Sequence, residues 1–194
     1  MEGMNNNSNL SRWEEEHLIK PILISFIVWN LLNVIALKLP INDKHLNEKD
    51  WFDFRNRIVA SLHGFTSAVL GAYSFHFMAQ ICGDSNNIYE QAAISMSTGY
   101  FIYDTLAMIY LGLMDSSMLF HHVLCILGLG VTLYQGVGGH YTLCGMFITE
   151  ISNTAMHGRF MLKYMGYRYT KAYEVLEILY IMQYLYGRLL IGPY

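Results

Sequence analysis

Ionisable side chains lie inside otherwise apolar stretches of this sequence. They are Asp104, His121, His122, Glu150, His157 and Arg188. Such a group is costly in a hydrocarbon environment unless it faces protein or water, so each is a candidate for function. Asn153 and His157 follow Glu150 at i+3 and i+7, which places all three on one face of a helix.

These residue types indicate one of two arrangements. In the first, they line a cavity that holds a lipid head group or a reacting acyl chain, with His121 and His122 as candidate bases or nucleophiles. In the second, Asp104 or Glu150 pairs with a histidine or arginine and ties helices together. Metal binding is a further possibility for His121, His122, His157, Asp104 and Glu150, but their spacing matches no local ligand motif. We therefore expect no metal and no cofactor other than bound lipid.

The composition indicates that lipid surrounds the elements that carry these residues. Of 194 residues, 54% are hydrophobic and 14% are charged, whereas soluble domains carry about a quarter charged residues. Residues 58–83 and 116–149 contain no Asp, Glu, Lys or Arg, and one helical crossing takes about 20 residues. The expected fold is an all-α, polytopic transmembrane bundle. A net charge of −3 argues against a nucleic-acid partner.

Apolar runs bounded by charges or turn residues predict six spans. They are Pro21–Leu39, Ile58–Ile81, Ala92–Leu113, Met118–Tyr134, Tyr141–Met161 and Tyr173–Ile191. Lys and Arg gather in residues 38–57 and 159–171 and are absent from 82–91 and 135–140. The basic loops are therefore predicted to be cytoplasmic, with both chain ends on the other side. The domain organisation is then a polar tail (1–20), a first transmembrane helix with a basic loop (21–49), and the remaining bundle (50–194).

The second span contains histidines and small residues of its own. We expect His63 and His76 to form hydrogen bonds between helices, and Gly64, Ser67, Gly71 and Ser74 to permit close packing. Trp51, Phe52 and Phe54 alternate with charges and predict an interfacial segment leading into this span. Cys82, Cys125 and Cys144 show no metal-like spacing and are expected to be buried thiols.

Four segments together resemble the TLC (TRAM–LAG1–CLN8) family. They are 51–64 (WFDFRNRIVASLHG), 99–104 (GYFIYD), 120–122 (FHH) and 149–153 (TEISN), the last leading to Arg159. The resemblance covers residues 50–194 and implies a multi-helix bundle around a lipid-accessible cavity. It points to Asp104, His121, His122, Glu150, Asn153, His157 and Arg159 as lipid-binding residues.

The resemblance also separates branches of that family. In ceramide synthases a His-His pair is followed by a His-Asp-x-Ser-Asp segment, whereas this chain has His121-His122 and then Thr149-Glu150-Ile151-Ser152-Asn153. The missing histidine and final aspartate argue against N-acyl transfer, and the sequence looks closer to the TLC-domain-containing branch. Members usually continue into a further span, so we expect either a bundle one helix short, with lipid or a partner subunit on its open side, or a chain cut short.

Three functions follow from this resemblance. The first is a lipid-binding or lipid-sensing membrane protein that affects lipid composition and is not an enzyme. The second is an accessory subunit of a larger membrane complex, and the third is an acyl-CoA-dependent N-acyltransferase. We expect the endoplasmic reticulum or a related endomembrane, with the mitochondrial inner membrane as the alternative. Glycosylation sequons at Asn6 and Asn9 offer a test.

Overall fold

The computed structural model describes residues 18–41, 45–78 and 83–191. In this part of the chain it forms six α-helices and no strand. The helices are α2 (Lys20–Lys38), α3 (Glu48–Phe77), α4 (Ile88–Tyr110), α5 (Ser116–Gln135), α6 (Gly139–Tyr164) and α7 (Lys171–Tyr184), and a π-helical segment, η2 (Leu185–Ile191), continues α7. The prediction of an all-α bundle is confirmed, and each predicted span overlaps one helix.

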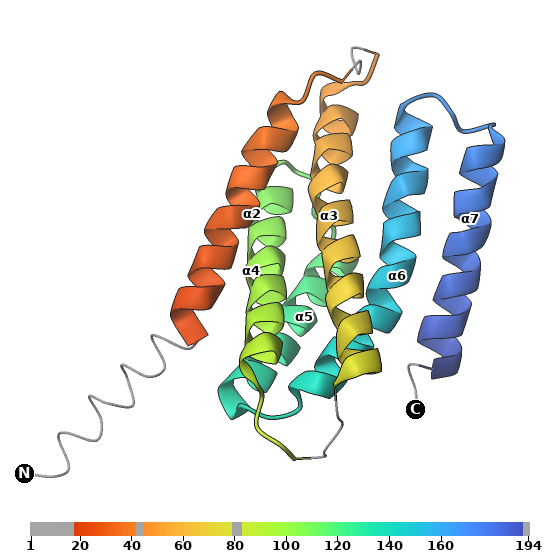
Figure 1. Cartoon of the computed structure of the whole chain (residues 1–194). Coiled ribbons are helices and arrows are strands. Elements are labelled where there is room, and N and C mark those ends of the chain that lie inside the picture. The colour runs from red at the N-terminus through yellow and green to blue at the C-terminus, as the bar shows by residue number, and fades with distance from the viewer. Residues whose placement is uncertain (1–17, 42–44, 79–82, 192–194) are drawn as a thin grey trace, which may run out of the picture.

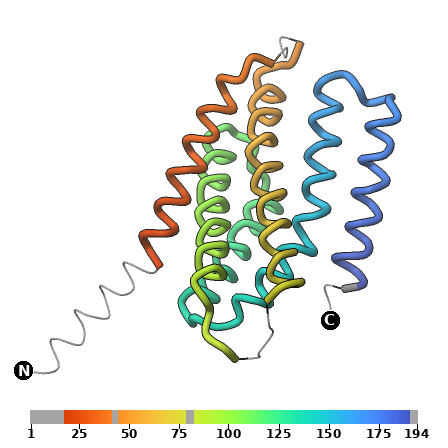
Figure 2. Tube along the Cα trace, in the orientation of Figure 1, coloured from red at the N-terminus to blue at the C-terminus, as the bar shows by residue number. Residues whose placement is uncertain are grey.

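Helices that follow one another in the chain run in opposite directions (Figure 1). The α2-to-α3, α4-to-α5 and α6-to-α7 connections lie at one end of the bundle, which carries the basic loops and is called the loop end below. α3 packs most extensively against α6, while α2 and α5 pack on α4, and α7 packs on α6. The Cα trace shows the same order, with α7 at the outer edge beside α6 (Figure 2).

Within the described residues, three helices are both long and apolar enough to cross a membrane: α2, α3 and α5. α7 alone is too short at 14 residues, but η2 extends it. α4 and α6 have 23 and 26 residues, and polar side chains such as Asp104 and Glu150 lower their apolarity. Those two side chains are buried inside the bundle, so the polarity does not face the surroundings. Because consecutive helices run in opposite directions and the polar side chains face inward, the arrangement agrees with six crossings.

Helix ends follow from local capping. The side chain of Asn47 accepts a hydrogen bond from the backbone N–H of Asp50 and starts α3. The aromatic segment predicted to be interfacial is therefore the first part of α3 itself, which begins ten residues before the predicted span. A tight turn joins α5 to α6, with Gly136 and Gly138 at positive φ.

The small residues of α3 allow it to approach α6 closely, as predicted. A Cβ atom on Gly71 would lie 2.5 Å from the backbone oxygen of Leu143 on α6. His63 also meets its prediction, because its Nε2 lies 3.2 Å from Ser97 Oγ on α4. The prediction for His76 is wrong. Its side chain is exposed near the end of α3, and its ring packs against Phe75 and Phe77 of the same helix.

The remaining predictions concern thiols and the N-terminal tail. Cys125 and Cys144 are free and half-buried, so they are less enclosed than expected. Cys82 and the sequons at Asn6 and Asn9 lie outside the described residues.

Candidate functional site

A cavity of about 370 Å³ lies within the bundle, bordered by α3, α4, α5, α6, α7 and η2. Six of the seven residues predicted to bind lipid line this cavity: Asp104, His121, His122, Glu150, Asn153 and His157. The seventh, Arg159, does not line it, because its Nη1 donates to Glu177 Oε1 of α7 over 2.9 Å. Helices far apart in sequence therefore bring the predicted residues together, and their role in binding stays a prediction.

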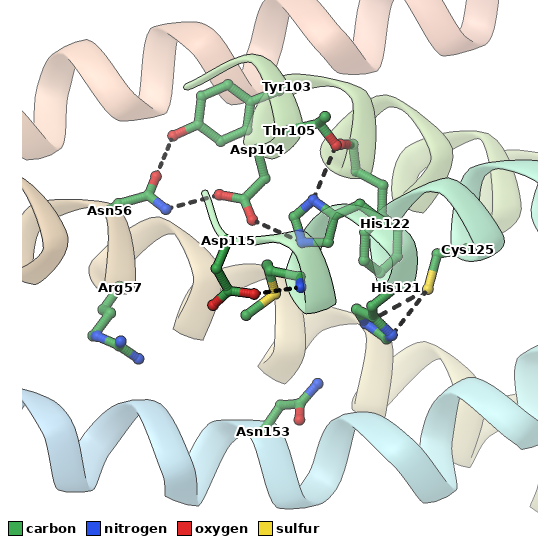
Figure 3. Close-up of polar contacts among 12 residues, drawn as sticks. Asn56, Arg57, Tyr103, Asp104, Thr105, Asp115, His121, His122, Cys125 and Asn153 are labelled. Carbon is green, nitrogen blue, oxygen red and sulfur yellow. Dashed lines mark hydrogen bonds and ion pairs between the residues drawn. The ribbon is translucent and has the colours of Figure 1, made fainter. Parts of the chain in front are cut away.

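Asp104 is the centre of a hydrogen-bonded network on one wall of the cavity (Figure 3). Asn56 of α3 donates to Asp104 Oδ1 over 2.8 Å, and the Tyr103 hydroxyl donates to Asn56 Oδ1 over 3.0 Å. On the other side, His122 Nε2 of α5 lies 3.5 Å from Asp104 Oδ2. Asp104 is 5% exposed and joins three helices, as the helix-tying alternative requires.

His122 is held at both ring nitrogens. The Thr105 hydroxyl donates to the Phe101 backbone oxygen over 2.6 Å, so Thr105 Oγ1 accepts from His122 Nδ1 at 2.9 Å. The contact of Nε2 with Asp104 therefore needs one further proton, carried by either the imidazole or the carboxyl group. His122 is 3% exposed, and its two contacts connect α5 to α4.

His121 differs from its neighbour, because its side chain is exposed and lines the cavity. Its Nε2 lies 3.6 Å from the Cys125 thiol one turn along α5, and its ring meets the edge of Phe101. A thiol is a weak hydrogen-bonding group. Figure 3 shows the imidazole beside Cys125 and away from the Asp104 network. His121 is therefore the imidazole of the pair that a ligand can reach.

A second chain of hydrogen bonds lies deeper in the cavity, between α6 and η2. Asn153 Nδ2 donates to Glu150 Oε2 over 3.1 Å, and Arg188 Nη2 donates to Asn153 Oδ1 over 3.1 Å. Glu150 also lies against Gly64 of α3. Gly64 is eleven residues from Asp53, so Glu150 lies about 16 Å below the loop end of the cavity along α3. Arg188 was singled out in the sequence with the other ionisable residues, but the seven residues predicted to bind lipid did not include it.

Near the loop end, the wall carries charges that the sequence analysis did not assign to the site. Arg57 Nε donates to Asp53 Oδ2 over 2.8 Å, and its Nη1 lies 3.4 Å from His157 Nδ1. The Tyr164 hydroxyl donates to Asp53 Oδ2. Burial and this carboxylate raise the pKa of Tyr164 above its ordinary value. The i,i+4 spacing of Asp53 and Arg57 was the available signal.

Apolar side chains also line the cavity and make it amphipathic. Phe101, Met108, Met118 and Met156 contribute this surface. In the part of the chain that the structure describes, no three His, Cys, Asp or Glu side chains are grouped so that they could hold a metal ion. The arrangement is suited to an organic ligand with both a polar and an apolar part.

Comparison with known proteins supplies the family. A family model described as the TLC domain matches residues 53–194, which include most of α3 and all of α4 to α7. No solved structure matches the chain. The match covers well over half of the sequence and contains every helix that borders the cavity. The chain therefore belongs to the TLC domain family and is a membrane protein with a lipid-related role.

Proposed function

We propose that this protein binds a membrane lipid in the cavity between α3, α4, α5, α6 and α7, and that this binding serves the sensing or maintenance of membrane lipid composition. The proposal rests on one observation: polar residues from five helices and apolar side chains line the same cavity. Membrane lipids combine the same two kinds of surface. The family assignment supports the same class of ligand.

The outer surface of the bundle supports a ligand that comes from the bilayer. Leu124, Leu127 and Val131 of α5 are about half exposed, as are Val175 and Ile178 of α7. Such apolar faces are stable in contact with the hydrocarbon core of a bilayer. A lipid in the surrounding bilayer is therefore the most abundant amphipathic molecule near the cavity.

The size of the cavity limits how much of a lipid it holds. At about 30 Å³ for a water-sized group, its 370 Å³ accommodate roughly a dozen such groups. This is enough for a polar part and the first portion of a chain. The rest of a long acyl chain would extend beyond the cavity into the apolar surroundings.

The test fills the cavity at its accessible histidine. His121→Trp should lower the amount of lipid that co-purifies with the full chain, as measured by mass spectrometry of the extracted complex. Leu127→Trp is the matched control, because it adds the same ring to the outer face of α5. Equal lipid content in both variants and the unmodified protein would contradict the proposal.

A combined variant tests the polar lining separately. His121→Ala together with Glu150→Ala removes an imidazole of α5 and a carboxyl group of α6 from the lining without filling the space. Co-purified lipid should fall here as well, because the polar part of the ligand loses partners. If lipid is retained by this variant and lost in His121→Trp, then the apolar lining alone would account for binding.

We place the protein nearer to the TLC-domain-containing branch than to the ceramide synthases, on the residues at 149–153. We also place it in the endoplasmic reticulum or a related endomembrane. Sensitivity of the full-length protein to a glycosidase, through Asn6 or Asn9, is the expected result. A protein without glycan that fractionates with mitochondria would favour the mitochondrial inner membrane.

A further inference from the structure

Arg188 has hydrogen-bonding capacity that the protein does not use. It lines the deep part of the cavity, and its Nη2 is directed to Asn153 Oδ1 at 3.1 Å and to the Thr149 backbone oxygen at 3.5 Å. Its Nε is buried and has no hydrogen-bond partner among the described residues. A buried donor without a partner is unfavourable by an amount comparable to a lost hydrogen bond. The Nη1 group has no hydrogen-bond partner among the described residues either, and it is not buried as Nε is, so it is the donor that a ligand acceptor can reach.

The local backbone holds Arg188 in this place. η2 is π-helical, a geometry that often occurs at functional sites. Gly187 lets η2 approach α6, since a Cβ atom there would lie 2.7 Å from the Ile148 backbone oxygen. The guanidinium group also lies 5.3 Å from the centre of the Tyr184 ring. Arg188 is therefore fixed against α6 with its planar fork on the cavity wall.

The charges around the cavity decide which acceptor fits. Arg188 is already coupled through Asn153 to the carboxyl group of Glu150. The lining contains four carboxyl groups, on Asp53, Asp104, Asp115 and Glu150, against the two guanidinium groups of Arg57 and Arg188. An anionic phosphate or carboxylate at this depth would face Glu150 in a site of low dielectric constant. A neutral acceptor avoids that repulsion and still satisfies the free N–H.

We propose that Arg188 binds the carbonyl oxygen of an ester-linked acyl chain, and so selects diacyl lipids over their ether analogues. This inference rests on the proposed lipid-binding function and adds the chemical group that is recognised. The carbonyl marks the point at which the polar part of such a lipid meets its chain.

The test compares two lipids that differ only in their two ester carbonyl groups. Dioleoyl phosphatidylcholine and the matching dialkyl ether are offered together to the purified full chain, and the bound ratio is read by native mass spectrometry. A hydrogen bond from a charged donor corresponds to about tenfold tighter binding of the ester. Arg188→Met should bring the ratio close to one. Arg159→Met is the matched control, because that arginine pairs with Glu177 away from the cavity, and it should keep the ester preference.

The possible outcomes separate the two proposals. If the unmodified protein binds both lipids equally, the role of Arg188 is refuted while lipid binding stands. If it binds neither lipid, with phosphatidylethanolamine pairs giving the same result, the proposed function fails and this inference fails with it. Tighter binding of oleate anion than of the diester would overturn the choice of a neutral acceptor. Because the decisive comparison uses the unmodified protein, a folding defect in Arg188→Met cannot obscure it.

Discussion

Gly71→Ala tests the seam between α3 and α6, on which the cavity wall depends. The added Cβ atom would lie 2.5 Å from the Leu143 backbone oxygen and 2.7 Å from Phe147 Cβ. Because such atoms normally approach to about 3.5 Å, the two helices must separate locally by about 1 Å. Neither backbone can move away as a flexible side chain could. The separation should extend along the α3–α6 contact, which also places Glu150 against Gly64.

The expected cost follows from two opposed effects. Overpacking of a closely packed site destabilises by about 1 to 3 kcal/mol, and alanine in place of glycine in a helix stabilises by about 0.5 to 1 kcal/mol. Gly71→Ala should therefore lower the thermal unfolding midpoint of the detergent-purified protein, followed by intrinsic fluorescence. It should also reduce co-purified lipid, because the α6 residues of the cavity move relative to α3.

Gly145→Ala is the matched control on the partner helix. It makes the same substitution within α6, where a Cβ atom would meet nothing within 4 Å. The unfolding midpoint should stay unchanged or rise slightly, since only the helix propensity changes. If Gly71→Ala and Gly145→Ala unfold at the same temperature, the close approach of α3 and α6 would be refuted.

Three further predictions concern the network, the topology and Arg159. Asp104→Ala should lower the free energy of unfolding by about 2 to 5 kcal/mol, because Asn56 and His122 each lose a partner. Asp104→Asn should lower it less. If both variants unfold at the same temperature as the unmodified protein, the network does not contribute to stability. In a chain whose native cysteines are replaced, a cysteine at Tyr169 should react with an impermeant maleimide from the cytoplasmic side and a cysteine at Ile88 from the opposite side, since both positions are exposed at opposite ends of the bundle; labelling of both from one side would contradict the orientation. Arg159→Met should change stability by no more than about 1 kcal/mol and leave bound lipid unchanged, because its ion pair is partly exposed; lost lipid would restore Arg159 to the site.

The fold was predictable because bilayer-spanning helices leave a strong sequence signal. Apolar runs interrupted by charges or glycines predicted each helix, and α2, α4, α5 and α6 begin within a few residues of the predicted spans. The start of α3 was missed by ten residues. Charged residues there were taken to end the apolar run, whereas Asn47 caps a helix that continues through them. Hydrophobicity locates the membrane-embedded part of a helix but does not show how far the helix extends into water.

The site was predictable to the extent that a polar group in an apolar run is conspicuous. Asp104, His122 and Glu150 were found on that basis, and all three are buried. Asp53 and Asp115 were missed because a charge near a helix end can reach water at little cost and gives no comparable signal. Arg159 was expected in the cavity from the family resemblance. Its partner Glu177 lies on the next helix, and only the packing of α7 against α6 places them together.

His121 and His122 differ in how freely each imidazole can take part in chemistry in the cavity. They are equivalent in sequence, yet successive residues on a helix point about 100° apart, so one can face the bundle while the other faces the opening. His122 has Thr105 at one nitrogen and Asp104 at the other, so a proton transfer through it would disturb the contacts that hold α4 to α5. His121 has only a thiol within reach on its own helix. Of these two histidines, His121 is therefore the one whose ring is free to exchange a proton with a ligand, while His122 and Asp104 hold α5 against α4.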